Sequence, residues 1–148
     1  MSPWLTQAEA DALLAMEKHR VDEERRQLPD FGGGLSVPLA SPDRAESFCL
    51  DITRSRINLI KGTFQNRART TIILARLDFG GSAHRSPDGQ EIGCPHLHLF
   101  REGYNDRWAI PIPTDRFPSI DDHFRLLQDF MCYCNVTRPP HFNQGLFT

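Results

Sequence analysis

Apolar and polar positions near the N-terminus follow a helical period. Thr6 followed by Glu9 matches a capping box, and behind it apolar residues recur every three or four positions. This pattern predicts a helix over residues 7–27 that ends before Pro29. Its second half is almost wholly polar, so we expect that half to lie on the surface. Residues 28–45 hold three glycines and three prolines without any period, which predicts a loop.

Between residues 46 and 113 the period changes to two, which predicts β-strands. The run ESFCLDITRS alternates, and RINLIKGTF follows it as the second arm of a hairpin. TTIILARLDF is β-branched and apolar on both faces, which is typical of a central strand. PHLHLFRE and RWAIPIP predict two more strands. The last should lie at a sheet edge, because Pro111 and Pro113 cannot donate ladder hydrogen bonds.

A second helix is predicted over residues 119–135. Ser119 can serve as its N-cap, and an apolar face follows at helical spacing, formed by Ile120, Phe124, Leu127, Met131 and Cys134. Residues 136–148 predict an extended tail. The sequence therefore predicts an α+β domain, residues 1–148, in which an N-terminal helix precedes an antiparallel meander of about five strands and a C-terminal helix packs on that sheet.

Composition narrows the class of protein. The 148 residues are 39% hydrophobic and 24% charged, as expected of one globular domain that needs no cross-links to fold. We find no apolar run long enough to span a membrane and no signal peptide, so we expect no membrane partner. Four unevenly spaced cysteines do not form a disulfide framework. These features predict a cytoplasmic protein with reduced thiols.

Charge is distributed unevenly along the chain. Between Asp51 and Asp78 there is no acidic residue but there are six cations, so this segment carries +6 in a chain whose net charge is −2. Such a segment favours an anionic partner, an acidic part of the same molecule, or a solvated basic face. The candidate phosphate-binding residues are Arg54, Lys61, Arg67, Arg69 and Arg76.

The segment CPHLHLFREGY holds the densest set of reactive side chains. In a strand, Leu97 and Leu99 share one face and should pack on the helices. The opposite face would then present Cys94, His96, His98, Phe100 and Glu102.

Three interpretations fit this face. The histidines could be ordinary hydrogen-bonded residues on a wet sheet surface. They could hold a zinc ion, with Cys94, His84 or Glu102 as a further ligand. They could also act as an acid–base pair on a phosphodiester, with arginine stabilising the developing charge and no cofactor required. His84, in a glycine-rich loop, and Tyr104, just past the strand, complete the candidate catalytic set of the third interpretation.

Two longer strings, LDITRSRINLIKGTFQNRARTTIILARLDFGG and HRSPDGQEIGCPHLHLFREGYNDRWA, resemble a family of small bacterial and phage-associated proteins of unknown function. The resemblance covers roughly Leu50 to Asn135, and its most specific parts are CPHLH and REGY. The N-terminal helix and the tail lie outside it. The resemblance implies no activity, although proteins of this size and genomic type are often toxins or anti-defence factors.

The leading hypothesis from the sequence is a metal-independent nuclease, an RNase that acts as the toxin of a toxin–antitoxin pair. Its partners would be RNA and an acidic antitoxin. One alternative is a non-enzymatic, anti-CRISPR-like inhibitor that binds a defence complex. A second alternative is a metal-dependent hydrolase that uses the histidine strand.

Overall fold

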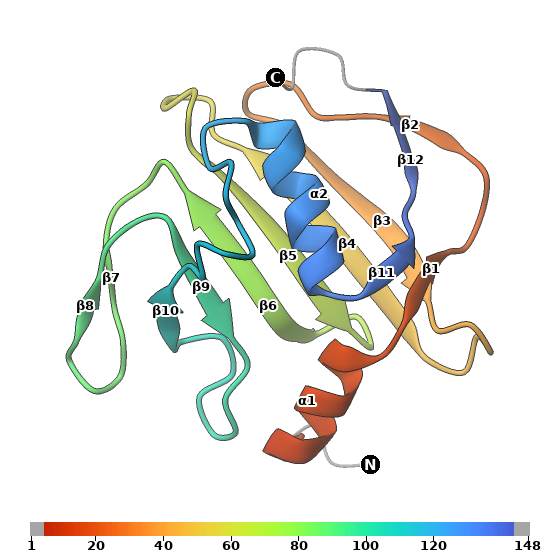
Figure 1. The fold of residues 1–148 in the computed structure, drawn as a ribbon, viewed down its shortest axis with the longest axis horizontal. Helices are drawn as coiled ribbons and strands as arrows, with labels where there is room; N and C mark the ends of the chain where they lie inside the picture. The colour runs from red at the N-terminus through yellow and green to blue at the C-terminus, as the bar shows by residue number, and fades with distance from the viewer. Residues whose placement is uncertain (1–4, 144–148) are drawn as a thin grey trace.

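A computed structural model describes residues 5–143 and shows an eight-stranded sheet with two helices (Figure 1). All neighbouring strands of this sheet are antiparallel except the parallel pair of β1 and β11. The spatial order is β10 (Ala109–Pro111), β9 (His96–Leu99), β6 (Ile72–Phe79), β5 (Gly62–Ala68), β4 (Ser47–Arg54), β3 (Gly34–Ala40), β1 (Lys18–Arg20) and β11 (Val136–Arg138).

The helices and two short strand pairs complete the described part of the chain. Helix α2 (His123–Tyr133) lies across one face of the sheet, and α1 (Gln7–Ala15) packs beside one end of β6 (Figure 1). Strand β2 (Arg25–Gln27) pairs in parallel with β12 (His141–Asn143), and β7 (His84–Arg85) forms a small antiparallel hairpin with β8 (Glu91–Ile92).

The face of the sheet under α2, here the core face, holds the hydrophobic core. It gathers alternate residues of the central strands, such as Ile52, Phe64 and Leu77, against the apolar stripe of α2. Phe64 lies 6.1 Å, centroid to centroid, from Phe130 of that helix. Each fully buried side chain of this size contributes roughly 1.5–3 kcal/mol. The core therefore fixes which residues of each strand point away from α2.

The opposite face of the central strands, here the polar face, carries charged and hydroxyl side chains. Because side chains alternate along a strand, the residues between the core positions all point to it. On the three central strands these residues include Asp51, Thr63, Gln65, Arg67, Arg76 and Asp78.

The predicted helix over residues 7–27 is correct at its start and wrong at its end. Thr6 and Glu9 form the capping box in both directions, but the helix stops at Ala15. The polar residues that follow enter the sheet as β1 between β3 and β11. They do so around Lys18, whose buried Nζ donates to carbonyl oxygens at the ends of both helices: Leu14 at 2.8 Å, Met16 at 2.9 Å and Cys134 at 2.7 Å.

The predicted loop over residues 28–45 is wrong, because β3 runs through it and buries Val37 and Leu39. Pro38 disguised this strand in the sequence. It is tolerated there because β1 pairs only with Leu39 and Ala40, so the proline lies beyond that ladder.

The α+β class is confirmed, and the strands predicted between residues 46 and 113 lie side by side in the sheet, although the whole sheet has eight strands. The strand predicted from RWAIPIP is at an edge, as expected. Residues 55–61 form a connection, and β5 begins only at Gly62. Helix α2 begins later than predicted, with Asp122 as its N-cap in place of Ser119. The extended tail is confirmed over residues 136–143, as β11 and β12, while 144–148 lie outside the described residues.

Candidate metal centre

The register between β6 and β9 assembles a polar cluster. Leu77 of β6 lies opposite Leu97 of β9 on the core face. The next pair in one direction is Asp78 with His96, and the pair on the other side of the leucines is Arg76 with His98. These two pairs point to the polar face because strand side chains alternate.

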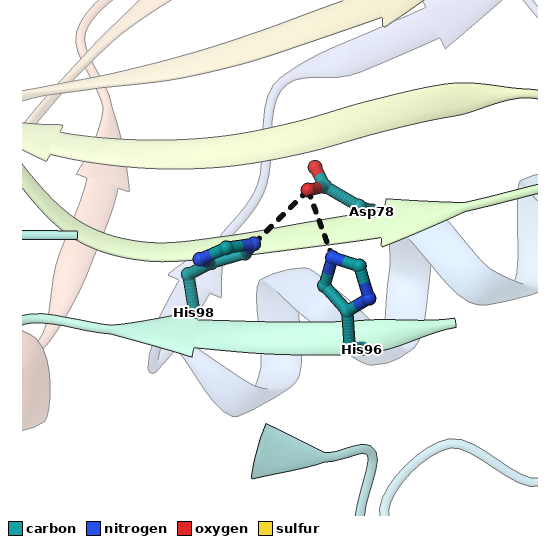
Figure 2. Close-up of side chains that lie close together, drawn as sticks. All are labelled: Asp78, His96 and His98. Atoms are coloured by element: carbon teal, nitrogen blue, oxygen red, sulfur yellow. Dashed lines mark hydrogen bonds and ion pairs between the residues drawn. The ribbon is translucent and has the colours of Figure 1, made fainter. Parts of the chain in front are cut away.

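Two imidazole nitrogens converge on one carboxylate oxygen in this cluster (Figure 2). Oδ2 of Asp78 lies 3.2 Å from Nε2 of His96 and 3.1 Å from Nε2 of His98. The three residues offer ligand atoms that all lie within 4.8 Å of one another. Two imidazoles and one carboxylate at such distances are a set of ligands suited to zinc or another divalent transition-metal ion.

Main-chain carbonyl groups orient both rings. Nδ1 of His98 lies 2.8 Å from the carbonyl oxygen of Asp106, and Nδ1 of His96 lies 3.3 Å from that of Gly93. A carbonyl oxygen can only accept, so each Nδ1 donates its hydrogen and leaves a lone pair on Nε2. Metal-binding histidines are held in the same way, with the second ring nitrogen donating to a carbonyl or carboxylate group.

Nε2 of His98 has conflicting neighbours. It lies 3.1 Å from Nη2 of Arg76, which can only donate, and 3.1 Å from Oδ2 of Asp78, which can only accept when ionised. If Nε2 carries a hydrogen it conflicts with Arg76, and if it is bare it conflicts with Asp78. A cation between His98 and Asp78 would turn the second conflict into two attractive contacts.

The electrostatics of the cluster favour the protonation states that bind a metal ion, which are an ionised carboxylate and a neutral imidazole. Burial alone would raise the pKa of Asp78, but its contact with His98 and the charge of Arg76 outweigh burial and lower this pKa to about 2. Burial lowers the pKa of His96, although Asp78 opposes that shift. Asp78 is therefore ionised, and His96 favours the neutral form that binds metals.

His96 and His98 lie on the face opposite Leu97, as predicted, but the wet sheet surface of the first interpretation is wrong, because both rings are buried. The side chains of His96 and His98 are 3% and 0% exposed, whereas that of Asp78 is 24% exposed. The rings are covered by the segment before β9 and by the loop after it, from which the carbonyl groups of Gly93 and Asp106 contact them. Solvent reaches the cluster mainly over Asp78 and its charged neighbours.

His84 reaches the cluster, as its position in the sequence suggested. Hairpin β7–β8 sets its ring 4.5 Å from the ring of His98 and 5.8 Å from that of His96, between centroids. Nε2 of His84 lies 2.7 Å from the carbonyl oxygen of Arg107, so Nε2 donates and Nδ1 keeps the lone pair. Tyr104 lies apart from the cluster: it is exposed and packs edge-on against Trp108.

The alternative ligands Cys94 and Glu102 do not join the cluster. The Cys94 sulfur accepts from the Gly81 amide at 3.2 Å. Glu102 accepts from the Gln7 amide at 2.7 Å, near the start of α1. The structure brings Asp78 to the histidines instead. The sequence signal for Asp78 was its place two residues after Arg76 in a strand that had been interpreted as apolar on both faces.

The five candidate phosphate-binding residues do not form one surface, and only Arg76 contacts the histidines. Arg67 pairs with Asp51 on the polar face, and Arg69 pairs with Glu46 at the turn after β5. Arg54 is buried on the core face beside Phe31, where burial lowers its pKa, and Lys61 is exposed in the connection before β5.

The fold and the cluster define a class: an α+β protein with two histidines and one aspartate on the polar face of a mainly antiparallel sheet. The chain belongs to a family of unknown function, since a sequence-family model, described as Family of unknown function (DUF6978), matches residues 5–136. This range includes the N-terminal helix, which the sequence resemblance had left outside. Comparisons with curated proteins and with solved structures gave no significant match.

Neither helix within residues 5–143 has the length and apolar character needed to cross a membrane.

Proposed function

We propose that the protein binds a divalent transition-metal ion at Asp78, His96 and His98 and is a metal-dependent hydrolase of phosphate esters, with RNA as the favoured substrate. The observation that carries this proposal is the convergence of two imidazole Nε2 atoms on a single oxygen of Asp78. Three protein ligands would leave a coordination position for water, as in catalytic zinc sites.

The same geometry gives less support to a metal-independent acid–base pair. An acid and a base must reach different atoms of a substrate. Here both rings are buried and both point to the same carboxylate. His96 and His98 therefore fit the role of ligands better than that of two separate catalysts.

His84 takes the acid–base role in this proposal. A bound ion lowers the pKa of its water ligand towards neutrality. His84 lies against the ring of His98, and its Nδ1 has a lone pair that can accept a proton from the attacking water. His84 would hold the proton taken from the water while the new oxygen–phosphorus bond forms, and would release it to solvent as the leaving oxygen takes up a proton from water.

The test combines metal analysis with RNA cleavage. Wild-type protein reconstituted with zinc should retain about one ion after desalting, and Asp78→Asn should retain far less because it removes the anionic ligand. Asp51→Asn is the matched control, since Asp51 lies on the same face but pairs with Arg67. Labelled RNA should be cleaved by the loaded wild type and not after chelation. A wild type that retains no metal from zinc, cobalt or manganese would refute the proposal.

A second candidate function is protein binding without catalysis. The connection between β4 and β5 exposes Ile57 (95%), Leu59 (53%) and Ile60 (64%), flanked by the cations Arg56 and Lys61 and by no acidic residue. Apolar side chains beside positive charge fit an acidic, partly apolar segment of a partner such as an antitoxin or a defence protein. Co-expression with the products of neighbouring genes, using the wild type and Ile57→Asp, tests it. A partner that co-purifies equally with both would exclude this surface.

A further inference from the structure

Arg76 contacts Nε2 of His98, the nitrogen atom that a metal ion would need as a ligand. Its Nη2 lies 3.1 Å from Nε2 of His98, and that nitrogen has one lone pair. An ion bound by His98 takes the lone pair, so the Nη2 hydrogen loses its acceptor. The remaining acceptor near Nη2 is Oδ2 of Asp78, at 3.4 Å, and this oxygen also faces the ion. Loading the centre therefore leaves an arginine donor beside the ion without a well-placed acceptor.

The other contacts of Arg76 hold this donor in place. Nη1 lies 2.5 Å from Oδ2 of Asp106, and Nε lies 3.3 Å from Oδ1 of Asp78. Two carboxylates thus fix the guanidinium from two sides. The side chains of Arg76, Asp78 and Asp106 are 24%, 24% and 23% exposed, so a ligand from solvent would meet Arg76 at the rim of the centre.

Charge favours an anion only once the ion is bound. Asp78, Asp106 and Arg76 together carry −1, and a divalent ion changes this to +1. The empty centre should repel anions, and the loaded centre should attract them. A phosphoryl group fits best, because it is anionic and its non-bridging oxygens, two in an RNA phosphodiester and three in a phosphomonoester, can be shared between an ion and an arginine.

We propose that the loaded centre binds a phosphoryl group that bridges the ion and Nη2 of Arg76. This inference rests on the metal site of the proposed function and adds the residue that would select phosphate esters at that site. Arg76 would be the specificity-determining residue of the site.

The experiment uses the full chain loaded with cobalt(II), whose visible absorption reports changes among its ligands. Inorganic phosphate should change the spectrum saturably in the wild type, and acetate should do so far more weakly. Calorimetry on the metal-free protein should detect no phosphate binding. Arg76→Met should weaken phosphate binding about 10- to 100-fold while cobalt still binds, since one charge-assisted hydrogen bond is lost.

The variant Asp106→Asn should change the affinity for phosphate in the opposite direction. It keeps the main-chain carbonyl that orients His98 and leaves an amide oxygen that can still accept from Nη1 of Arg76, but it removes one negative charge, so phosphate should bind several-fold more tightly. Arg67→Met is the control, because Arg67 is an arginine of the same face paired with Asp51, and it should leave phosphate binding unchanged.

The outcomes separate the two proposals. If cobalt does not bind, the metal site and this inference both fail. If cobalt binds but phosphate does not, or binds equally well to Arg76→Met, only this inference fails. Weaker phosphate binding in Asp106→Asn would contradict the charge argument. Equal affinity for acetate would overturn the assignment to phosphate esters.

Discussion

Oδ2 of Asp78 lies 3.1 Å from Nε2 of His98, although the two residues are 20 positions apart in the chain. The contact depends on the pairing of β6 with β9, which in turn is fixed by Leu77 and Leu97 in the core. A slip of one residue would turn the histidines into the core. The hydrophobic pattern therefore positions the candidate metal ligands.

Metal binding should raise the thermal stability of the protein. An ion that binds the folded state alone stabilises it by about 2.7 kcal/mol when present at a hundred times its Kd. For a chain of this size that corresponds to an increase in Tm of roughly 5–10 °C. We expect this increase in a thermal scan of the wild type with zinc.

The same scan on two variants tests the site. Asp78→Asn should lose most of the zinc-dependent increase, and Asp51→Asn should keep it because its carboxylate pairs with Arg67 away from the histidines. An equal increase in all three proteins would mean that zinc binds elsewhere.

Lys18 should make the free energy of unfolding depend on pH in the alkaline range. Burial lowers the pKa of Lys18 to about 8, below its value in the unfolded chain. Between about pH 8 and 10 the unfolded state therefore binds more protons, and Lys18 contributes a free energy of unfolding that rises with pH. Burial raises the pKa of the Cys134 thiol to about 12, which contributes a fall in stability above about pH 9.

The two groups oppose each other, so the variant Lys18→Met isolates the lysine. The difference in unfolding free energy between wild type and Lys18→Met should grow by roughly 2 kcal/mol from pH 8 to 10, as measured by urea unfolding. Lys61→Met is the control, because Lys61 is exposed. A difference that stays constant with pH would show that Lys18 remains charged throughout this range.

Local patterns predicted the strands that carry the site but not all of the fold. Alternation between residues 46 and 113 is a property of each segment, so it could be recognised without knowing the partners. The strand character of Lys18–Arg20 is not local. It comes from pairing with Leu39 and Ala40 on one side and Val136 on the other, and an isolated EKHR sequence fits a helix equally well.

Only part of the site was predicted, because local patterns reveal single strands but not how strands pair. His96 and His98 were found because they share one face of one strand. Asp78 was missed because its role depends on the register between two strands, and the apolar neighbours in TTIILARLDF concealed its polar face. The paired state of Arg67 and Arg69 likewise depends on Asp51 and Glu46, which lie earlier in the chain.

Gly80 should be far less replaceable than Gly89. Both have positive φ, +70° and +85°, where any other residue is strained by about 1–2 kcal/mol. A Cβ at Gly80 would also lie 2.2 Å from the carbonyl oxygen of Ile60, whereas nothing lies within 4 Å at Gly89. We expect Gly89→Ala to cost about 1 kcal/mol and Gly80→Ala at least twice that. Urea unfolding measures both, and equal costs would mean that the connection before β5 moves aside freely.

RNA binding by the basic segment should depend on its exposed cations. Lys61 is exposed, while Arg69 is held by Glu46 at 2.6 and 3.1 Å. Lys61→Ala should reduce the salt slope of RNA affinity by about one, and Arg69→Ala should reduce it by less because its charge is already compensated. Fluorescence anisotropy at several salt concentrations measures both slopes. A larger effect at Arg69 would show that RNA displaces Glu46.

Replacing His84 should separate catalysis from metal binding. His84 contacts the ring of His98 but is not one of the three converging ligands, so His84→Ala should keep its zinc. If its Nδ1 accepts the proton of the attacking water, the cleavage rate of labelled RNA should fall about 10²- to 10⁴-fold. His98→Ala should instead lose both zinc and activity. Tyr104→Phe is the control. Because Tyr104 packs on Trp108, this variant should leave the cleavage rate and the zinc content unchanged.

If His84→Ala cleaves RNA like the wild type, the water is deprotonated by another group. If His84→Ala loses zinc, His84 is a fourth ligand, and the centre is closed in the manner of a structural zinc site.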